Sequence, residues 1–307
     1  MDYEKKELIN ALLECQDFNQ VYSQYDILYP YILIDAILDE LKRLRENDER
    51  YWILKQIYTE YCCVCHITDE NIMLISDTHI SSTNSNQALY YLNFVLKFCE
   101  QNQIKGLIHC GDIGDGLITT YDNGKVMLHD FKNQDDARKD ADYVLENYPT
   151  SPYVTQLLLG GNHDTLYLDK KVDILGELAK EKKIKPLGYN QALITFNGHN
   201  IFLQHNIFDS WVLCDKAPYS LILAGHTHKA EFQNQYIKIP MLSNEKRRNK
   251  VDDETLVAPG FFVMKPVDDD NVMFERYFFE DYSLRKDLKP YYYQLNDSYH
   301  NILIKKL

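Results

Sequence analysis

Long apolar runs are missing from the 307-residue sequence. A membrane-spanning helix needs roughly 18 to 20 consecutive, mostly apolar residues, and no stretch of this chain reaches that length. Residues 1–10 are too polar for a secretory signal peptide. We therefore expect a chain without a membrane segment, located in the cytoplasm.

A regular cysteine spacing and an excess of positive charge are missing as well. The seven cysteines form no regular framework, which favours reduced thiols over a disulfide scaffold. Lysine and arginine total 33 against 46 aspartates and glutamates, a formal net charge of −13. Because this balance opposes attraction to phosphate backbones, a nucleic-acid partner is disfavoured.

The chain also lacks internal repeats and low-complexity tracts. Its hydrophobic content of 45% and charged content of 26% are ordinary for a globular protein. A chain of this length can bury a large core. We expect one large α/β domain with an appendage.

Residues 1–66 have the apolar spacing of short helices, expected near 8–13, 18–25 and 32–44. Three helices with a tight link before the third resemble a helix-turn-helix module. The segment carries more acidic than basic residues, so contact with DNA is disfavoured. We interpret it as an accessory segment for a protein partner or for self-association.

From residue 67 to residue 285, predicted strands alternate with predicted helices, as in an α/β catalytic domain. The pair Asn197-Gly198 predicts a tight hairpin between strands 192–196 and 201–204. A second hairpin is predicted at 261–279. Residues 286–307 form a Tyr-rich tail with no clear assignment.

Five predicted strands end in side chains that can bind metal ions. The ends of strands in α/β folds are where ligands usually bind, so this recurrence predicts a site. In chain order the side chains are Asp77 and His79, Asp112, Asn162 and His163, His205, and finally His226 and His228.

The motifs at these strand ends resemble those of the calcineurin-like metallophosphoesterase family. In order they read Asp-x-His, Gly-Asp-x-x-Asp-Gly, Gly-Asn-His-Asp, a lone His and Gly-His-x-His, within residues 70–230. The resemblance implies two mixed β-sheets packed as a sandwich and flanked by helices. It also implies two metal ions at the strand ends.

The same resemblance implies a ligand set. One ion would be held by Asp77, His79 and His228, the other by Asn162, His205 and His226, with Asp112 bridging the two. Imidazoles and carboxylates suit divalent Mn, Fe, Co or Zn. Two such ions would activate a bridging hydroxide for attack on phosphorus.

Two further residues gain roles from the resemblance. His163 corresponds to the family histidine that protonates the departing oxygen, and Asp115 to the carboxylate that orients this histidine. Gly111, Gly161 and Gly225 are expected to let the backbone turn sharply beside the ions.

Other histidines have different interpretations. His109 lies within a predicted strand and is expected to be a core residue. His199 competes with His205 as the lone histidine, but the apolar strand 201–203 leads directly into His205 and favours it.

Departures from the family pattern bear on the substrate. Gly116 stands where phosphoprotein phosphatases have arginine, and Asp164 where they usually have glutamate. Both favour a phosphodiester or another small phosphoester. The polar segment 115–152 is expected to form a lid, with Arg138 and Lys139 contacting phosphate.

We therefore expect a dinuclear metal-dependent phosphoesterase. One alternative is a nuclease acting on DNA or RNA, with residues 1–66 as a targeting element. Another is a non-catalytic scaffold of the same fold.

Overall fold

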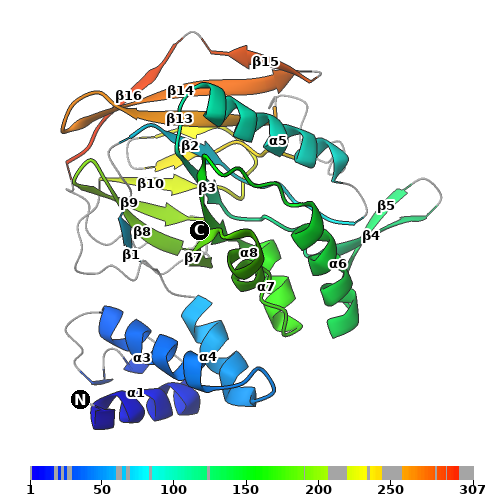
Figure 1. Cartoon of the computed structure of the whole chain (residues 1–307), viewed down its shortest axis with the longest axis vertical. Helices are drawn as coiled ribbons and strands as arrows, with labels where there is room; N and C mark the ends of the chain where they lie inside the picture. Colours follow the sequence, from blue (N-terminus) through cyan, green and yellow to red (C-terminus); the bar gives the residue numbers. More distant parts are fainter. Residues whose placement is uncertain are drawn as a thin grey trace.

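The computed structural model describes residues 2–16, 20–21, 24–25, 30–59, 64–66, 70–82, 85–122, 125–189, 191–206, 220–233, 236–243, 258–280, 282–287 and 289–296. Figure 1 shows two β-sheets facing each other, helices along the outside, and a group of N-terminal helices at one end. The expected mixed α/β sandwich is therefore confirmed.

Among the described residues, the first sheet has eight strands, and the four consecutive strands at one edge run parallel. In spatial order they are β15 (Ser283–Lys286), β14 (Asn271–Glu280), β13 (Gly260–Pro266), β2 (Ile72–Ile75), β3 (Gly106–Cys110), β6 (Thr155–Gly160) and β7 (Lys185–Tyr189), and β16 (Tyr291–Gln294) pairs with β14. The predicted second hairpin is β13–β14. The start of the Tyr-rich tail thus adds a strand to this sheet.

Residues alternate between the two faces of this sheet. In β2, Met73 and Ile75 join the core under the outer helices, whereas Ile72 and Leu74 join the core between the sheets. Strands buried on both faces read as continuous apolar runs. The outer helices are α5 (Asn86–Gln101), α6 (Gln134–Asn147), α7 (Asn162–Asp169) and α8 (Ile174–Lys182).

The second sheet has six strands. In spatial order they are β1 (Val64–His66), β8 (Gln191–Phe196), β9 (His199–Gln204), β10 (Leu221–Ala224), β12 (Tyr236–Lys238) and β11 (Glu231–Phe232). Strands β8 and β9 form the predicted tight hairpin, with Asn197 at φ 50° and Gly198 at φ 77°. Strands β9 and β10 are parallel, so their carboxyl ends lie at the same edge.

The N-terminal helices cover the outer face of the second sheet. They are α1 (Asp2–Cys15), α3 (Pro30–Arg43) and α4 (Glu49–Thr59). Leu12 and Ile37 share one buried cluster with Leu193 and Phe202 of the sheet. Residues 64–66 continue into this sheet as β1, parallel to β8. The apolar faces of these helices are thus used within the chain. Of the expected helix at 18–25, residues 18–19 and 22–23 lie outside the described residues.

A buried ion pair anchors α4. Lys55 Nζ lies 2.6 Å from Asp173 Oδ2, and the two side chains are only 15% and 12% exposed. Asp173 caps α8 by accepting a hydrogen bond from Gly176 N, and it accepts another from Tyr189 Oη. The N-terminal helices are therefore joined to the start of α8 by charge, in addition to their apolar contacts with the second sheet.

Replacing Lys55 with methionine should lower the free energy of unfolding by about 2 kcal/mol. This is less than for a fully buried charge pair, because Asp173 keeps two other donors. Urea unfolding would measure the loss. Lys5→Met is the matched control, since the Lys5–Asp39 pair is 37% and 51% exposed, and its effect should stay below about 1 kcal/mol. Equal small effects in both variants would contradict the anchoring role.

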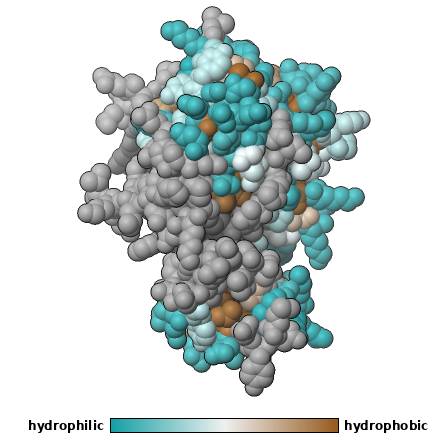
Figure 2. Space-filling model, turned by 90° about the vertical axis from the view of Figure 1, so that its left-hand side faces the viewer, coloured by the Kyte–Doolittle hydropathy of each residue, from teal (hydrophilic) through white to brown (hydrophobic). Residues whose placement is uncertain are grey.

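One face of the molecule shows few apolar groups among the described residues. On the face drawn in Figure 2, hydrophilic side chains cover most of the described surface and hydrophobic ones form small separate spots. Among the described helices, none has the length and apolar composition needed to cross a bilayer.

Candidate metal centre

The candidate ligands follow strands whose carboxyl ends meet at one edge of the sandwich. Strands β2, β3 and β6 run parallel in the first sheet, and β9 and β10 run parallel in the second. Main-chain hydrogen bonds join the loops directly beyond β2 and β3: Asp77 N donates to Gly111 O at 2.9 Å and His79 N to Asp112 O at 3.1 Å. Side chains from both sheets therefore converge.

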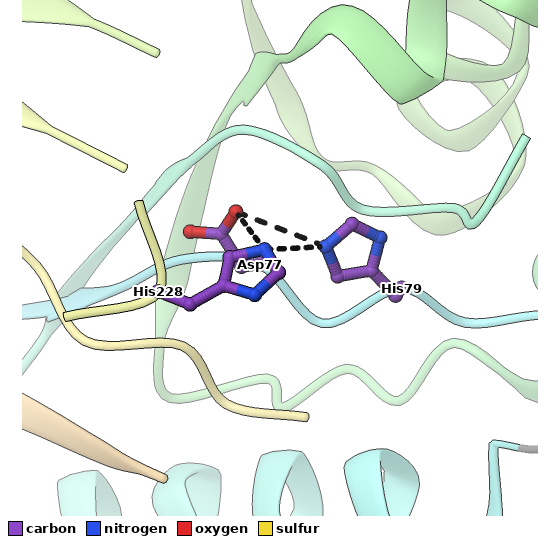
Figure 3. A group of neighbouring side chains, drawn as sticks. All are labelled: Asp77, His79 and His228. Atoms are coloured by element: carbon purple, nitrogen blue, oxygen red, sulfur yellow. Dashed lines mark hydrogen bonds and ion pairs between the residues drawn. The ribbon is translucent and has the colours of Figure 1, made fainter. Parts of the chain in front are cut away.

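Asp77, His79 and His228 form the first group (Figure 3), named here the Asp77 group. His79 Nε2 lies 3.2 Å from His228 Nε2, and Asp77 Oδ1 lies 3.3 Å from His228 Nε2 and 3.8 Å from His79 Nε2. A point equidistant from the corners of such a triangle is about 2 Å from each, the length of a zinc–nitrogen bond. The donor types and their spacing fit a divalent cation.

Asp112, Asn162, His205 and His226 form the second group, named here the Asn162 group. Asn162 Oδ1 lies 3.1 Å from His205 Nε2 and 2.9 Å from His226 Nδ1. Asp112 Oδ2 lies 3.1 Å from His205 Nε2. His205 Nδ1 is 2.8 Å from the carbonyl O of Cys110, and this contact orients Nε2 toward Asn162 and Asp112.

Asp112 connects the two groups. Its Oδ2 faces His205 of the Asn162 group at 3.1 Å and also lies 3.8 Å from His79 Nε2 of the Asp77 group. Its other oxygen, Oδ1, accepts a hydrogen bond from His163 N at 2.9 Å. One carboxylate oxygen is thereby oriented toward both groups. All seven ligands expected from the sequence lie in this cluster.

Burial and charge compete at the carboxylates. Burial alone raises the pKa of Asp77 and Asp112, but the facing histidines outweigh it and hold both pKa values below the usual range. Burial lowers the pKa of His79 and His226. For His205 burial also acts downward, yet Asp112 and Asp77 raise its pKa to about 10. The carboxylates stay ionised although buried, which is the form that binds cations.

The backbone at the candidate ligands is strained, a feature that sequence reasoning missed. Five of the seven have left-handed φ angles: Asp77 at 52°, His79 at 45°, Asp112 at 55°, His226 at 67° and His228 at 60°. Non-glycine residues rarely adopt this conformation. Such strain tends to gather at functional sites, where the surrounding structure compensates for it.

The three glycines beside the ligands differ in role, which corrects the expectation of three sharp turns. Of these three, Gly111 alone has a positive φ, of 102°. Gly161 has an extended backbone, and a Cβ there would collide with the carboxylate of Asp112. A Cβ on Gly225 would collide with Ser76 Oγ. Gly161 and Gly225 therefore provide space for close approach.

Asp115 contacts His163 mainly through its backbone. His163 Nδ1 donates a short hydrogen bond to the main-chain carbonyl O of Asp115. The Asp115 carboxylate oxygen Oδ1 lies 3.4 Å from His79 Nδ1 and 3.8 Å from His163 Nδ1. The carboxylate is therefore nearer to His79 than to the histidine that it was expected to orient.

Asp164 is a buried residue whose role sequence reasoning missed. Its carboxylate accepts hydrogen bonds from the backbone N–H groups of Ile113, Gly114 and Gly161. Burial, and then the charge of Asp112, raise its pKa to about 6. Asp164 thus joins the loop that carries Asp112 to the start of α7. Its place next to His163 was the only signal in the sequence.

Helix α6, in the segment expected to be a lid, is a fixed part of the fold. Ala137, Ala141 and Val144 are fully buried in the core under the outer helices. Both hydrogen bonds from Arg138 Nη2 go to Glu177, at 2.8 Å, so its guanidinium is used in an ion pair rather than facing phosphate. The other part of the segment is the hairpin of β4 (Leu117–Asp122) and β5 (Lys125–Asp130), which projects from the body in Figure 1.

The two other histidines interpreted from the sequence, His109 and His199, lie where the sequence places them. His109 is fully buried within β3. His199 lies at the start of β9, with Nε2 3.2 Å from Asp270 Oδ1, at the end of the strand opposite His205.

Fold and site together define an α/β sandwich with Asp, Asn and His side chains gathered at one edge of its sheets. A family model described as calcineurin-like phosphoesterase matches residues 70–287. The chain belongs to this family.

Several solved structures are similar to this chain. Vps29 from Chaetomium thermophilum is 12% identical over 73% of this chain and 97% of its own, with a TM-score of 0.40. Vacuolar Protein Sorting 29 from Cryptosporidium parvum is 14% identical over 72% and 97%, with a TM-score of 0.38. Purple acid phosphatase PPD1 from yellow lupin seeds is 10% identical over 73% and 53%, with a TM-score of 0.42. No curated protein matches the sequence.

Proposed function

We propose that the chain is a hydrolase that uses two divalent cations to cleave a phosphoester, preferably a phosphodiester. The position of Asp112 carries this proposal. Its Oδ2 lies 3.1 Å from His205 Nε2 and 3.8 Å from His79 Nε2, and an oxygen that faces two groups of donors can be shared by two cations.

Each group of donors has a distinct task in this proposal. The Asp77 group holds one cation and the Asn162 group holds the other, with Asp112 common to both. Mn, Fe, Co and Zn all suit these donors. When bound, two such cations supply activated water and offset negative charge on the phosphate.

His163 is the proposed proton donor to the departing oxygen. Its main-chain N–H is fixed by Asp112 Oδ1 and its Nδ1 by the carbonyl O of Asp115. These two contacts set the orientation of the ring beside Asp112, where the proposed substrate phosphate would bind. A positioned imidazole of this kind typically contributes 10²- to 10⁴-fold to a rate.

The surroundings of Gly116 support a substrate other than a phosphoprotein. Its φ is +64°, and a Cβ there would collide with the carbonyl O of His163. The arginine that phosphoprotein phosphatases have at this position would therefore be strained here. A diester carries less charge per phosphate than a monoester and needs fewer cationic side chains.

Metal removal tests the proposal directly. Purified protein treated with EDTA should lose its hydrolysis of bis-p-nitrophenyl phosphate down to the uncatalysed rate, and Mn²⁺ should restore it. p-Nitrophenyl phosphate should be the poorer substrate in kcat/KM. A folded, Mn²⁺-loaded protein that cleaves neither compound would contradict the proposal and favour a non-catalytic scaffold.

A substrate panel separates the remaining alternative. Cyclic nucleotides, dinucleotides, phosphoproteins and single-stranded DNA would be compared at one concentration of Mn²⁺. Preference for single-stranded DNA, with binding that weakens as salt rises, would identify a nuclease. The net charge of −13 leads us to expect the small diesters to be preferred.

A further inference from the structure

His109 is fully buried in β3, and the proposed chemistry does not use it. Its Nδ1 lies 3.3 Å from the backbone N of Gly111, and its Nε2 lies 3.0 Å from Thr78 Oγ1. Thr78 is itself fully buried, and its Oγ1 lies 2.9 Å from the carbonyl O of Ile113. The imidazole therefore connects the loop after β2 with the loop after β3.

The hydrogen bonds define one tautomer of His109. The Gly111 N–H can only donate, so Nδ1 accepts and the proton resides on Nε2. Nε2–H then donates to Thr78 Oγ1, and the Thr78 hydroxyl donates to the Ile113 carbonyl. Burial lowers the pKa of His109 to about 3, so the ring is neutral, as these bonds require. Every group in this relay has its partner.

The relay lies between the loops that carry the proposed ligands. Thr78 is the residue between Asp77 and His79, and Gly111 directly precedes Asp112. These ligands have left-handed φ angles of 45° to 55°, and strained loops persist only when their surroundings hold them. A buried side-chain contact between the loops is suited to that task.

We propose that His109 is a positioning residue. Through Thr78 and Gly111 it holds the loop of residues 76–80 at a fixed distance from Asp112, and so it sets the affinity of the centre for divalent cations. This inference rests on the proposed metal centre. It assigns His109 a role beyond filling the core, although its contacts reach no metal ligand directly.

Binding of Mn²⁺ by titration calorimetry is the test, with the free energy of unfolding measured separately in EDTA. His109→Phe removes both hydrogen bonds at similar volume, and Thr78→Val removes the hydroxyl with little change of shape. Each should weaken Mn²⁺ binding about tenfold or more, the usual cost of losing a residue that orients metal ligands. Because both changes break the same contact, the double variant should bind about as weakly as either single variant.

Phe196→Leu is the stability control. Phe196 is fully buried at the end of β8 that pairs with His199, away from His205. This variant should therefore be destabilised but bind Mn²⁺ with wild-type affinity. His109→Gln, whose amide can donate in place of Nε2, should recover part of the lost affinity. Thr78→Val keeps the test valid if His109→Phe fails to fold.

The outcomes separate the two proposals. Wild-type protein that binds no Mn²⁺ would overturn the metal centre and this inference with it. If the wild-type protein binds Mn²⁺ and both Thr78→Val and His109→Phe bind it with the same affinity, only the role of His109 would be overturned. If Phe196→Leu also lost affinity, in the same proportion to its loss of unfolding free energy as His109→Phe and Thr78→Val, that role would be overturned too.

Discussion

Asp112→Asn is expected to lower kcat/KM for bis-p-nitrophenyl phosphate on the order of 10³-fold, one of the two largest effects anticipated for this protein. The side chain keeps its shape, but its oxygen loses the negative charge. That oxygen lies 3.1 Å from His205 and 3.8 Å from His79. A neutral amide there would bind both proposed cations more weakly, so metal content should fall together with activity.

Steady-state kinetics and elemental analysis of the purified variant would measure both losses. Asp270→Asn is the matched control, because Asp270 is an exposed carboxylate beside His199, at the far end of β9. It should retain wild-type kinetics and metal content. Full metal content and full activity in Asp112→Asn would show that Asp112 is not shared between two cations.

The ligand cluster could be predicted because its signal lies in single strands. An apolar run such as 72–75 forms a strand that ends two residues before Asp77, and the family motifs give the order of the remaining candidate ligands. The choice of His205 over His199 depended on the apolar strand that leads into His205. That strand does deliver His205 to the cluster and places His199 at the other end.

Contacts between segments distant in sequence were not predictable in the same way. Nothing in the pattern of residues 1–66 indicates that their apolar faces pack on β8 and β9, because an amphipathic helix does not identify its partner. The same holds for Asp164, whose three backbone donors come from two loops. Left-handed φ angles at Asp and His ligands leave no mark in composition, unlike those at glycine.

The expected lid shows how a polar composition misleads. The segment 115–152 is polar and rich in turn residues, but one face of α6 carries the small residues Ala137 and Ala141. These let the helix approach the sheet closely and become part of the core. Its exposed charges, such as Arg138, then find partners on α8. A high charge content does not distinguish a mobile cover from the outer face of a packed helix.

His163→Gln is the second variant with a large expected effect. If His163 gives a proton to the departing oxygen, kcat should fall about 10²- to 10⁴-fold for substrates with alkyl leaving groups. The loss should be much smaller for p-nitrophenyl esters, because p-nitrophenolate departs readily without a proton. Comparing a p-nitrophenyl diester with a methyl or nucleoside diester would therefore isolate proton donation from other roles of the side chain.

The metal content of His163→Gln decides between two roles for His163, proton donor and metal ligand. Together with His79 and Asp112 it forms a third group of donors close enough to hold a cation, and its ring centroid lies 4.7 Å from that of His79. The proton-donor role requires His163→Gln to keep its metal, as should the control His129→Gln on the projecting hairpin. Loss of metal, with equal losses of kcat for both leaving groups, would make His163 a ligand. Its Nδ1 already donates to the Asp115 carbonyl O, which leads us to expect full metal content.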